Sequence, residues 1–247
     1  MTTDELRQHA HEWGADLVGV ADLSLLEGIP TYPPDLLAGY TRAVSIAVRL
    51  ADGVIDAIVD RPTPLYQQHY QRVNILLDLI ALRVSGFLQQ KGAKALPIPA
   101  SQVLDETAWT SYLSHKAVAL AAGIGWQGKS LLVVNRDYGP RIRLVTVLTD
   151  LELPADRPVK NMCAECSACA DACPAQAIRN VNTTWHYANR EEALVFQRCA
   201  DKVSQEFRRI PFIEHPICGV CIRACPFGQK KSSGNHRGQR LTKEPPF

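Results

Sequence analysis

The sequence has no long apolar run, no signal peptide and no marked excess of either charge. No stretch reaches the roughly 18 consecutive apolar residues that a membrane-spanning helix needs. Residues 1–16 are polar and acidic, without the apolar core of a secretory signal. Lys and Arg number 27 against 25 Asp and Glu, a net charge of +2, which does not indicate a globally basic nucleic-acid binder. We therefore expect a cytoplasmic protein with no membrane partner.

Cysteine is absent from the first 162 residues and abundant after them. The last third of the chain holds eight cysteines: Cys163, Cys166, Cys169, Cys173, Cys199, Cys218, Cys221 and Cys225. Half-cystines spread through a small secreted domain would indicate disulfides, but these crowd one region of a chain expected to be cytoplasmic. Metal ligation is therefore the better interpretation.

The first 157 residues combine helical and strand patterns without a regular strand–helix–strand repeat. The apolar spacing predicts helices over 4–13, 65–90 and 115–122, and extended segments over 17–20, 43–48, 95–99, 131–134 and 142–148. Asp4 is expected to cap the first helix, and Gly92 and Gly123 to end the other two. This order favours an α+β fold over a doubly wound sheet. The expected division is 1–157, a ferredoxin-like region over 158–228, and a basic tail over 229–247.

The cysteines form two runs whose spacing is typical of bacterial ferredoxins. The first run is Cys163, Cys166, Cys169 and Cys173, followed by Pro174. Three cysteines, each separated from the next by two residues, can bind one cluster. An expected helix over 174–178 would direct Cys173 to a second cluster. The second run is Cys218, Cys221 and Cys225, followed by Pro226, with Cys199 upstream. An expected helix over 191–208 fills part of the enlarged gap.

This pattern predicts two [4Fe–4S] clusters that are bound crosswise. One would be held by Cys163, Cys166, Cys169 and Cys225, and the other by Cys173, Cys199, Cys218 and Cys221. Two zinc sites are the alternative, although structural zinc prefers separated pairs of cysteines and neither run is built that way. Clusters that only stabilise a small domain are a further alternative to an electron pathway.

A glycine-rich loop over 122–130 is the second informative segment. Its sequence, Ala-Gly-Ile-Gly-Trp-Gln-Gly-Lys-Ser, satisfies the spacing of a phosphate-binding loop. Such a loop follows a strand and opens a helix, whereas here a helix precedes and a strand follows. Nucleotide hydrolysis is therefore not favoured.

Taken together, these segments resemble the epoxyqueuosine reductases. The resemblance rests on the loop over 123–129, on 135–139 (Asn-Arg-Asp-Tyr-Gly), on 148–153, on the cysteine runs, and on 14–20 near the N-terminus. It implies a nitroreductase-like α+β domain that binds cobalamin, as in the related reductive dehalogenases, with two clusters that deliver electrons to the cobalt. It also implies that the loop lines the corrinoid site through Gly123, Gly125, Trp126, Gly128, Lys129 and Ser130.

The sequence departs from this family at two points. Trp109 stands where the resemblance expects a catalytic aspartate, and the nearest carboxylates are Asp105 and Glu106. The chain ends soon after Cys225, without the helical-repeat region with which these enzymes hold tRNA. A small-molecule substrate is therefore expected in place of tRNA.

Several side chains could move protons in a reduction. Tyr66, His69 and Tyr70 share one face of the expected helix over 65–90, and His115 begins the next helix. A reduced substrate needs a proton, which a tyrosine or histidine could supply. The candidate catalytic residues are Tyr66, His69, Asp105 and His115. The alternative is that amphipathic aromatic residues pack a helix with their polar ends in water.

The favoured hypothesis is an oxygen-sensitive reductase. A low-potential donor such as ferredoxin or flavodoxin would reduce the clusters, which would pass electrons to a cofactor in the N-terminal domain. Cobalamin is the first candidate for that cofactor and flavin a less favoured one. Arg141 and Arg143 are expected on a solvated strand face, although corrinoid side-chain amides or an anionic substrate could use them. The main alternative is an electron-transfer protein without substrate chemistry of its own. RNA binding by the basic tail is a weaker one.

Overall fold

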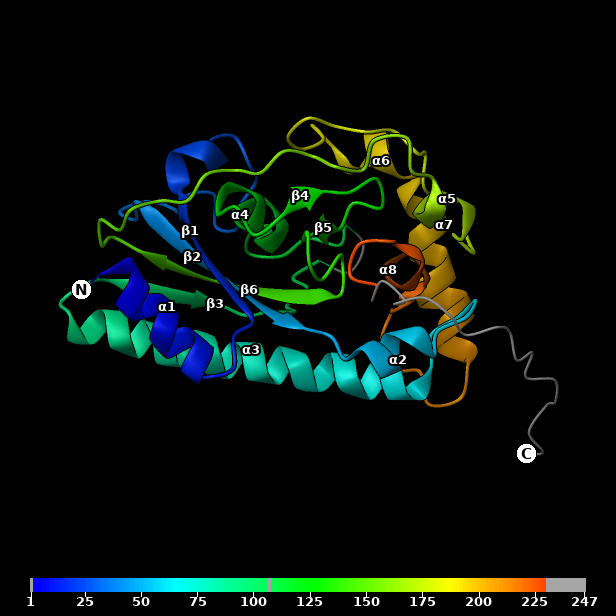
Figure 1. Cartoon of the computed structure of the whole chain (residues 1–247), viewed down its shortest axis with the longest axis horizontal. Coiled ribbons are helices and arrows are strands. Elements are labelled where there is room, and N and C mark those ends of the chain that lie inside the picture. Colours follow the sequence, from blue (N-terminus) through cyan, green and yellow to red (C-terminus); the bar gives the residue numbers. More distant parts are fainter. Residues whose placement is uncertain (1, 106–107, 230–247) are drawn as a thin grey trace, which may run out of the picture.

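The computed structural model, which describes residues 2–105 and 108–229, is built around one antiparallel sheet. Its strands are β1 (Leu17–Asp22), β2 (Arg42–Arg49), β6 (Ile142–Thr149) and β3 (Ala95–Ile98), in that spatial order. Helices α1 (Thr3–Glu12) and α3 (Pro64–Gln90) pack on one face, and α4 (His115–Ala121) packs on the other (Figure 1). The α+β class predicted from the sequence is confirmed.

The two faces of the sheet differ because neighbouring strand residues point to opposite sides. Val44, Ile46 and Val48 of β2 belong to the core beneath α3, whereas Ala43 and Ala47 belong to the core beneath α4. Small residues on the second face let α4 pack close to the sheet. The closest approach is at Gly19 of β1, where a Cβ would overlap the carbonyl oxygen of Ala122.

The helices begin and end at residues with the expected chemistry, with one exception. Thr2, and not Asp4, caps α1, and its hydroxyl accepts a hydrogen bond from the Glu5 amide at 3.1 Å. Thr63 and Ser114 cap α3 and α4 in the same way. The Gly123 backbone turns to a φ of 67° directly after α4, a conformation that favours glycine.

The edge strand β3 is only half as long as its neighbour. It pairs with Thr146–Thr149 of β6, so among the described residues no strand lies beside 142–145 on the side of β6 opposite β2. The chain leaves β3 through a long loop over 99–114 that returns to the start of α4. This open edge of β6 therefore lies between the first turns of α4 and the N-terminal half of α3.

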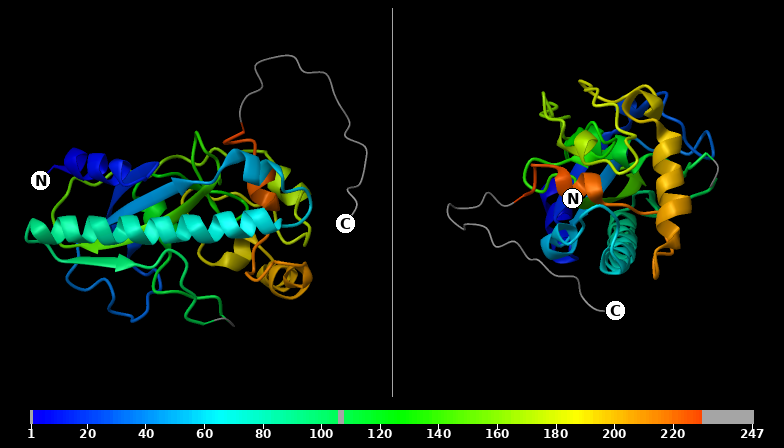
Figure 2. Two further views of the ribbon diagram at one scale, coloured as in Figure 1. Left: turned by 90° about the horizontal axis from the view of Figure 1, so that it is seen from below. Right: turned by 90° about the vertical axis from the view of Figure 1, so that its right-hand side faces the viewer.

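The cysteine region lies at one end of the molecule, beside α2 (Asp52–Asp56) and the N-terminal end of α3 (Figure 2). Its helices are α5 (Ala168–Asp171), α6 (Arg190–Ala193), α7 (Phe196–Asp201) and α8 (Val220–Ala224). Ile213, Ile217, Val220 and Ile222 belong to the same core as α3. The two regions thus share packing, and the division at 157–158 stays a prediction. The tail over 230–247 lies outside the described residues.

Three segments differ from the expectation. Residues 174–178 form a turn instead of a helix, and the helix expected over 191–208 is interrupted at Leu194–Val195. Both differences have one cause, because Ile178 bridges Leu194 and the Val195 amide donates to Ala177 at 2.8 Å. The strand expected over 131–134 is shortened to β5 (Val133–Val134), which pairs with β4 (Trp126–Gln127).

Candidate functional site

The first cysteine group surrounds a pocket that joins both runs. It is lined by four cysteines, three residues of the glycine loop and three apolar residues: Cys163, Cys166, Cys169, Cys225, Gly128, Lys129, Ser130, Val134, Pro226 and Phe227. Cys225 follows the end of α8, Cys163 and Cys166 flank a tight turn before α5, and Cys169 lies within α5. Ala164 has a φ of 41° in that turn, and the Cys166 amide donates to the Cys163 carbonyl at 3.0 Å.

The remaining four cysteines form a second group. Burial, with smaller contributions from the nearby Cys199 and Cys173, raises the pKa of Cys218 to about 12. Burial also raises the pKa of Cys221, again with contributions from the other thiols of this group. Gly219 sits between Cys218 and Cys221 at a φ of 84° and turns the chain into α8.

These two groups fit [4Fe–4S] clusters. All eight cysteines are free, and each group offers four sulfur ligands, as a cubane cluster requires. Within residues 2–105 and 108–229, no three His, Cys, Asp or Glu side chains converge as the ligands of a single metal ion do. The first group instead surrounds a pocket. The buried, mutually repelling thiolates would be stabilised by the positive charge of an iron–sulfur core.

The glycine loop supports the first cysteine group. The Trp126 indole Nε1 donates to Cys163 Sγ at 3.3 Å, and Lys129 Nζ donates to the Cys166 carbonyl at 3.0 Å. A Cβ on Gly125 would overlap the Val134 carbonyl oxygen, and the loop side chains are buried. The glycines therefore allow the chain to pack on itself. The expected corrinoid contacts of the loop stay a prediction.

Trp126→Phe is expected to lower the reduction potential of the first cluster by an amount on the order of tens of millivolts. The substitution removes the N–H that donates to Cys163 Sγ, and such hydrogen bonds stabilise the more negative, reduced cluster. A redox titration followed by electron spin resonance measures the shift. The matched control is Trp185→Phe, because Trp185 packs on His186 at a ring distance of 5.8 Å and not on a sulfur. An unchanged potential would contradict this role.

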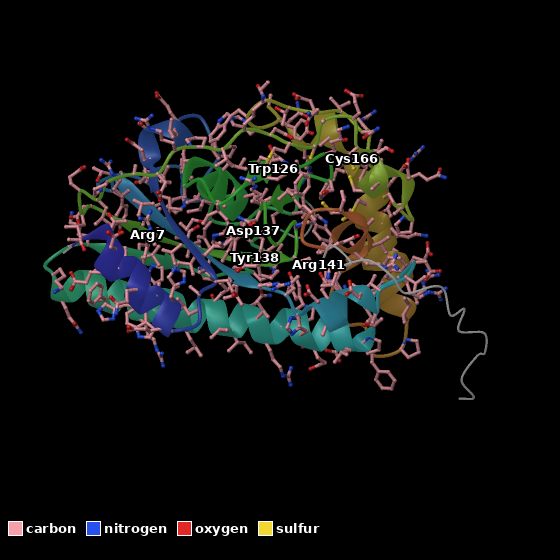
Figure 3. The ribbon with its side chains drawn as sticks, viewed as in Figure 1. Arg7, Trp126, Asp137, Tyr138, Arg141 and Cys166 are labelled. Atoms are coloured by element: carbon pink, nitrogen blue, oxygen red, sulfur yellow. The ribbon has the colours of Figure 1, made fainter. Side chains whose placement is uncertain are left out.

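A second loop, over 135–139, holds the end of the second cysteine run. Asn135 stabilises it, because its Oδ1 accepts from the Asp137 and Tyr138 amides and its Nδ2 donates to the Ile124 carbonyl at 2.6 Å. The Trp126 ring meets Phe227 edge to face at 4.9 Å. Figure 3 labels Trp126, Asp137 and Tyr138 near the middle of the molecule, beside the cysteine region. Trp126 of the glycine loop contacts Cys163, and Gly139 of the 135–139 loop lies against the Phe227 backbone. Both loops therefore contact the cluster-binding region.

A polar cluster lies at the open edge of β6. The Arg143 guanidinium donates to the Tyr70 hydroxyl and to Asn74 Oδ1, each at 3.0 Å, and stacks 4.2 Å above the Tyr70 ring. The Tyr70 hydroxyl also contacts Ser101 Oγ at 3.0 Å. Burial would raise the pKa of Tyr70, but Arg143 and the hydrogen bonds from Ser101 and Asn74 outweigh burial and lower it. The surroundings of Tyr70 therefore favour its ionised form more than burial alone would.

The structure places His115 in this cluster with both ring nitrogens engaged. Its Nε2 donates to the Pro99 carbonyl at 2.9 Å, and its Nδ1 lies 2.8 Å from Thr146 Oγ1. Burial lowers the pKa of His115 to about 4, with a further contribution from Arg143. His115 is therefore a neutral imidazole with a fixed tautomer, which positions the start of α4.

The other expected catalytic residues are not brought together. Tyr66 is buried, meets Tyr70 at a ring distance of 6.3 Å and lies against Gly219 between two cysteines of the second group. His69 Nε2 accepts from the Ala51 amide at 3.0 Å. Asp105 is exposed, and its Oδ1 accepts from the Ala108 amide at 2.9 Å. Glu106 lies outside the described residues.

Two residues of the site were not predicted. Lys116, beside His115, has its pKa lowered to about 8 by burial and by the nearby Arg143 and Arg190. Arg141 was expected on a solvated face, but it is 2% exposed and pairs with Asp52 at 3.1 Å and Asp56 at 2.7 Å. Arg141 and both aspartates line a further pocket next to α8. The spacing of residues in the sequence does not predict the surroundings of Lys116 or Arg141, because both depend on contacts with segments far away in the chain.

Comparisons with known proteins agree with these cysteine groups. The family described as "4Fe-4S double cluster binding domain" matches residues 162–228. Epoxyqueuosine reductase from Vibrio cholerae is 26% identical over 265 residues, covering 96% of this chain and 71% of the relative. Epoxyqueuosine reductase from Escherichia coli is 24% identical, and the match covers 98% of this chain and 68% of that enzyme. A tetrachloroethene reductive dehalogenase from Dehalobacter restrictus is 37% identical over 103 residues, covering 40% and 17%.

Solved structures share the fold. A catabolic reductive dehalogenase in complex with 3-bromo-4-hydroxybenzoic acid superposes with a TM-score of 0.71 at 19% identity, covering 91% of this chain and 31% of that one. An epoxyqueuosine reductase with a tRNA stem loop has a TM-score of 0.59 at 25% identity, covering 92% and 65%. The chain thus spans about a third of the first protein and about two thirds of the second.

The fold and the two cysteine groups define a double-cluster iron–sulfur protein of the reductase type. The chain is an epoxyqueuosine reductase-like and reductive dehalogenase-like protein that carries a 4Fe-4S double cluster domain. Among the helices of the described ranges, none has the length and apolar character to cross a membrane.

Proposed function

We propose that this protein is an iron–sulfur reductase that delivers electrons from its second cysteine group to a substrate at the open edge of β6. The observation that carries the proposal is the contact between the two sites. Tyr66 packs on Gly219 between Cys218 and Cys221, and Tyr66 meets Tyr70 of the polar cluster. A low-potential ferredoxin or flavodoxin is the proposed donor, and the substrate is a small molecule.

Tyr70 is the proposed proton donor. Reduction of a carbon–heteroatom bond consumes two electrons and adds a proton to the carbon or to the leaving group. Arg143 holds the Tyr70 hydroxyl and stabilises the phenolate that remains after the proton has left. His115 keeps the start of α4 in place without changing its own charge near neutral pH.

Cobalamin is the proposed second cofactor. When bound, it would supply the metal centre that reduces the substrate, while the two clusters supply single electrons. The fit rests on the donors at the open edge of β6, where Ser101 and Arg143 could hold corrin amide oxygens. Both ring nitrogens of His115 are already hydrogen-bonded, so this residue would help to shape the site and would not be a metal ligand.

Anaerobic purification followed by cobalamin titration tests the proposal. We expect full iron and sulfide content for two clusters and a change in the cobalt absorption bands and in the Co(II) spin-resonance signal as cobalamin binds. Flavin is titrated in parallel. Full cluster content without binding of either cofactor would contradict the proposal and favour the electron-transfer protein.

A further inference from the structure

One face of α3 carries large apolar side chains that the described part of the chain leaves exposed. Ile75, Leu79 and Leu82 are 58%, 51% and 59% exposed. The opposite face of the same helix, with Leu77 and Ile80, is buried in the core. Figure 2, left, shows α3 running along the underside of the molecule, with its length toward the viewer. The exposed side chains therefore form an apolar surface that is separate from the core.

These side chains follow the spacing by which two long helices pack along each other. They belong to a row on one face of α3 at alternating steps of three and four residues: Arg72, Ile75, Leu79, Leu82 and Gly86. Such a row stays on one side of a helix over several turns, so that a second helix can lie along it. Single exposed apolar residues are common on protein surfaces, whereas an aligned row of them is typical of a contact surface. We call these five residues the α3 stripe.

The α3 stripe is complementary to itself when a second copy lies antiparallel to the first. If Leu79 faces Leu79 of the second copy, then Ile75 faces Leu82. The same register sets Arg72 opposite Gly86. Around Gly86 there is open space, because a Cβ there would meet no heavy atom within 4 Å. A two-fold axis at Leu79 therefore pairs apolar side chains with each other and gives the long arginine room over a glycine.

Charge favours the same orientation. The antiparallel register sets Arg72 beside the C-terminal end of the other α3, which is the negative end of the helix dipole. Glu12 also lies at that end, since its carboxylate is 3.2 Å from the His9 ring, which meets the Phe87 ring at 4.8 Å. Among the ion pairs of residues 2–105 and 108–229, none involves Arg72, which donates to Gln68. A parallel pair would instead bring two Arg72 side chains together.

We propose that the α3 stripe is the contact surface between two copies of this chain, which pair antiparallel along α3. In this register the two helices overlap over residues 68–90, a length of about 35 Å. The helical repeat of 3.6 residues places Tyr70 and Leu79 on opposite sides of α3. The pairing therefore leaves the polar cluster at the open edge of β6 uncovered, and each copy keeps its own candidate site.

Sedimentation velocity of the full-length anaerobic protein with both clusters tests the pairing. We expect a dimer that dissociates on dilution. Leu79→Arg should raise the dimer dissociation constant by about thirtyfold or more, because it sets two like charges at the centre of the contact. Leu65→Arg is the matched control, since Leu65 is similarly exposed on α3 but the register sets it beyond the end of the other α3. Iron and sulfide content shows that each variant is folded.

Arg72→Ala tests the orientation. In the antiparallel pair it removes the charge beside the end of the other helix and should weaken the dimer by about fivefold. In a parallel pair it would relieve repulsion, so a stronger dimer would overturn the antiparallel register. A wild-type protein that stays monomeric at about 0.1 mM would overturn the proposal, and would leave the stripe to a different protein. A dimer that Leu79→Arg and Leu65→Arg weaken equally would overturn it as well.

Discussion

Cys225→Ala is expected to remove the cluster of the first cysteine run, although Cys225 belongs to the second run. The substituted protein should retain about half of its iron and sulfide, because one of two four-iron clusters is lost. The reason is geometric, since Cys225 lines the same pocket as Cys163, Cys166 and Cys169. Cys173→Ala should remove the other cluster, because Cys173 acts on the thiols of Cys199, Cys218 and Cys221.

The identity of the surviving cluster decides between crosswise and sequential binding. Trp126 donates only to Cys163 among the cysteines, so Trp126→Phe reports on the first cluster. In the Cys225→Ala background this second substitution should leave the remaining potential unchanged. In the Cys173→Ala background it should lower the potential. The reverse pattern would show that each run binds its own cluster and would contradict the crosswise assignment.

The cluster ligands were predicted from cysteine spacing, and the helices from the periodicity of apolar residues. Iron–sulfur ligation requires cysteines at fixed separations, so the runs around Cys163 and Cys221 can be recognised in the sequence without a structure. The long helix α3 is also readable, because its apolar residues repeat at helical spacing over 27 residues. Both signals are local in the chain.

The side chains at the open edge of β6 could not be predicted in the same way. Tyr70, Ser101 and Arg143 are far apart in the sequence, and their side chains meet at the part of β6 that has no pairing with β3. The glycine loop shows the opposite case, in which a strong local pattern has a packing role. Gly125 and Gly128 approach Val134, so their lack of a side chain serves the fold around the first cluster.

Gly139→Ala is expected to loosen the binding of the first cluster. Gly139 has a φ of 56°, and a Cβ there would overlap the Phe227 carbonyl oxygen. The conformational cost alone is about 1–3 kcal/mol, and the overlap adds to it. Phe227 lies two residues after Cys225 and packs on Trp126. Displacing Phe227 should therefore also displace a cluster ligand.

The rate at which an iron chelator removes iron from anaerobic protein measures this effect. Gly139→Ala should raise that rate by about tenfold or more, since 1.4 kcal/mol corresponds to a factor of about ten. Gly86→Ala is the matched control, because Gly86 lies inside α3 with open space around its Cα. Alanine should stabilise that helix by about 0.5–1 kcal/mol and leave iron release unchanged. Equal release rates for the two variants would show that contact between Gly139 and Phe227 does not hold the cluster in place.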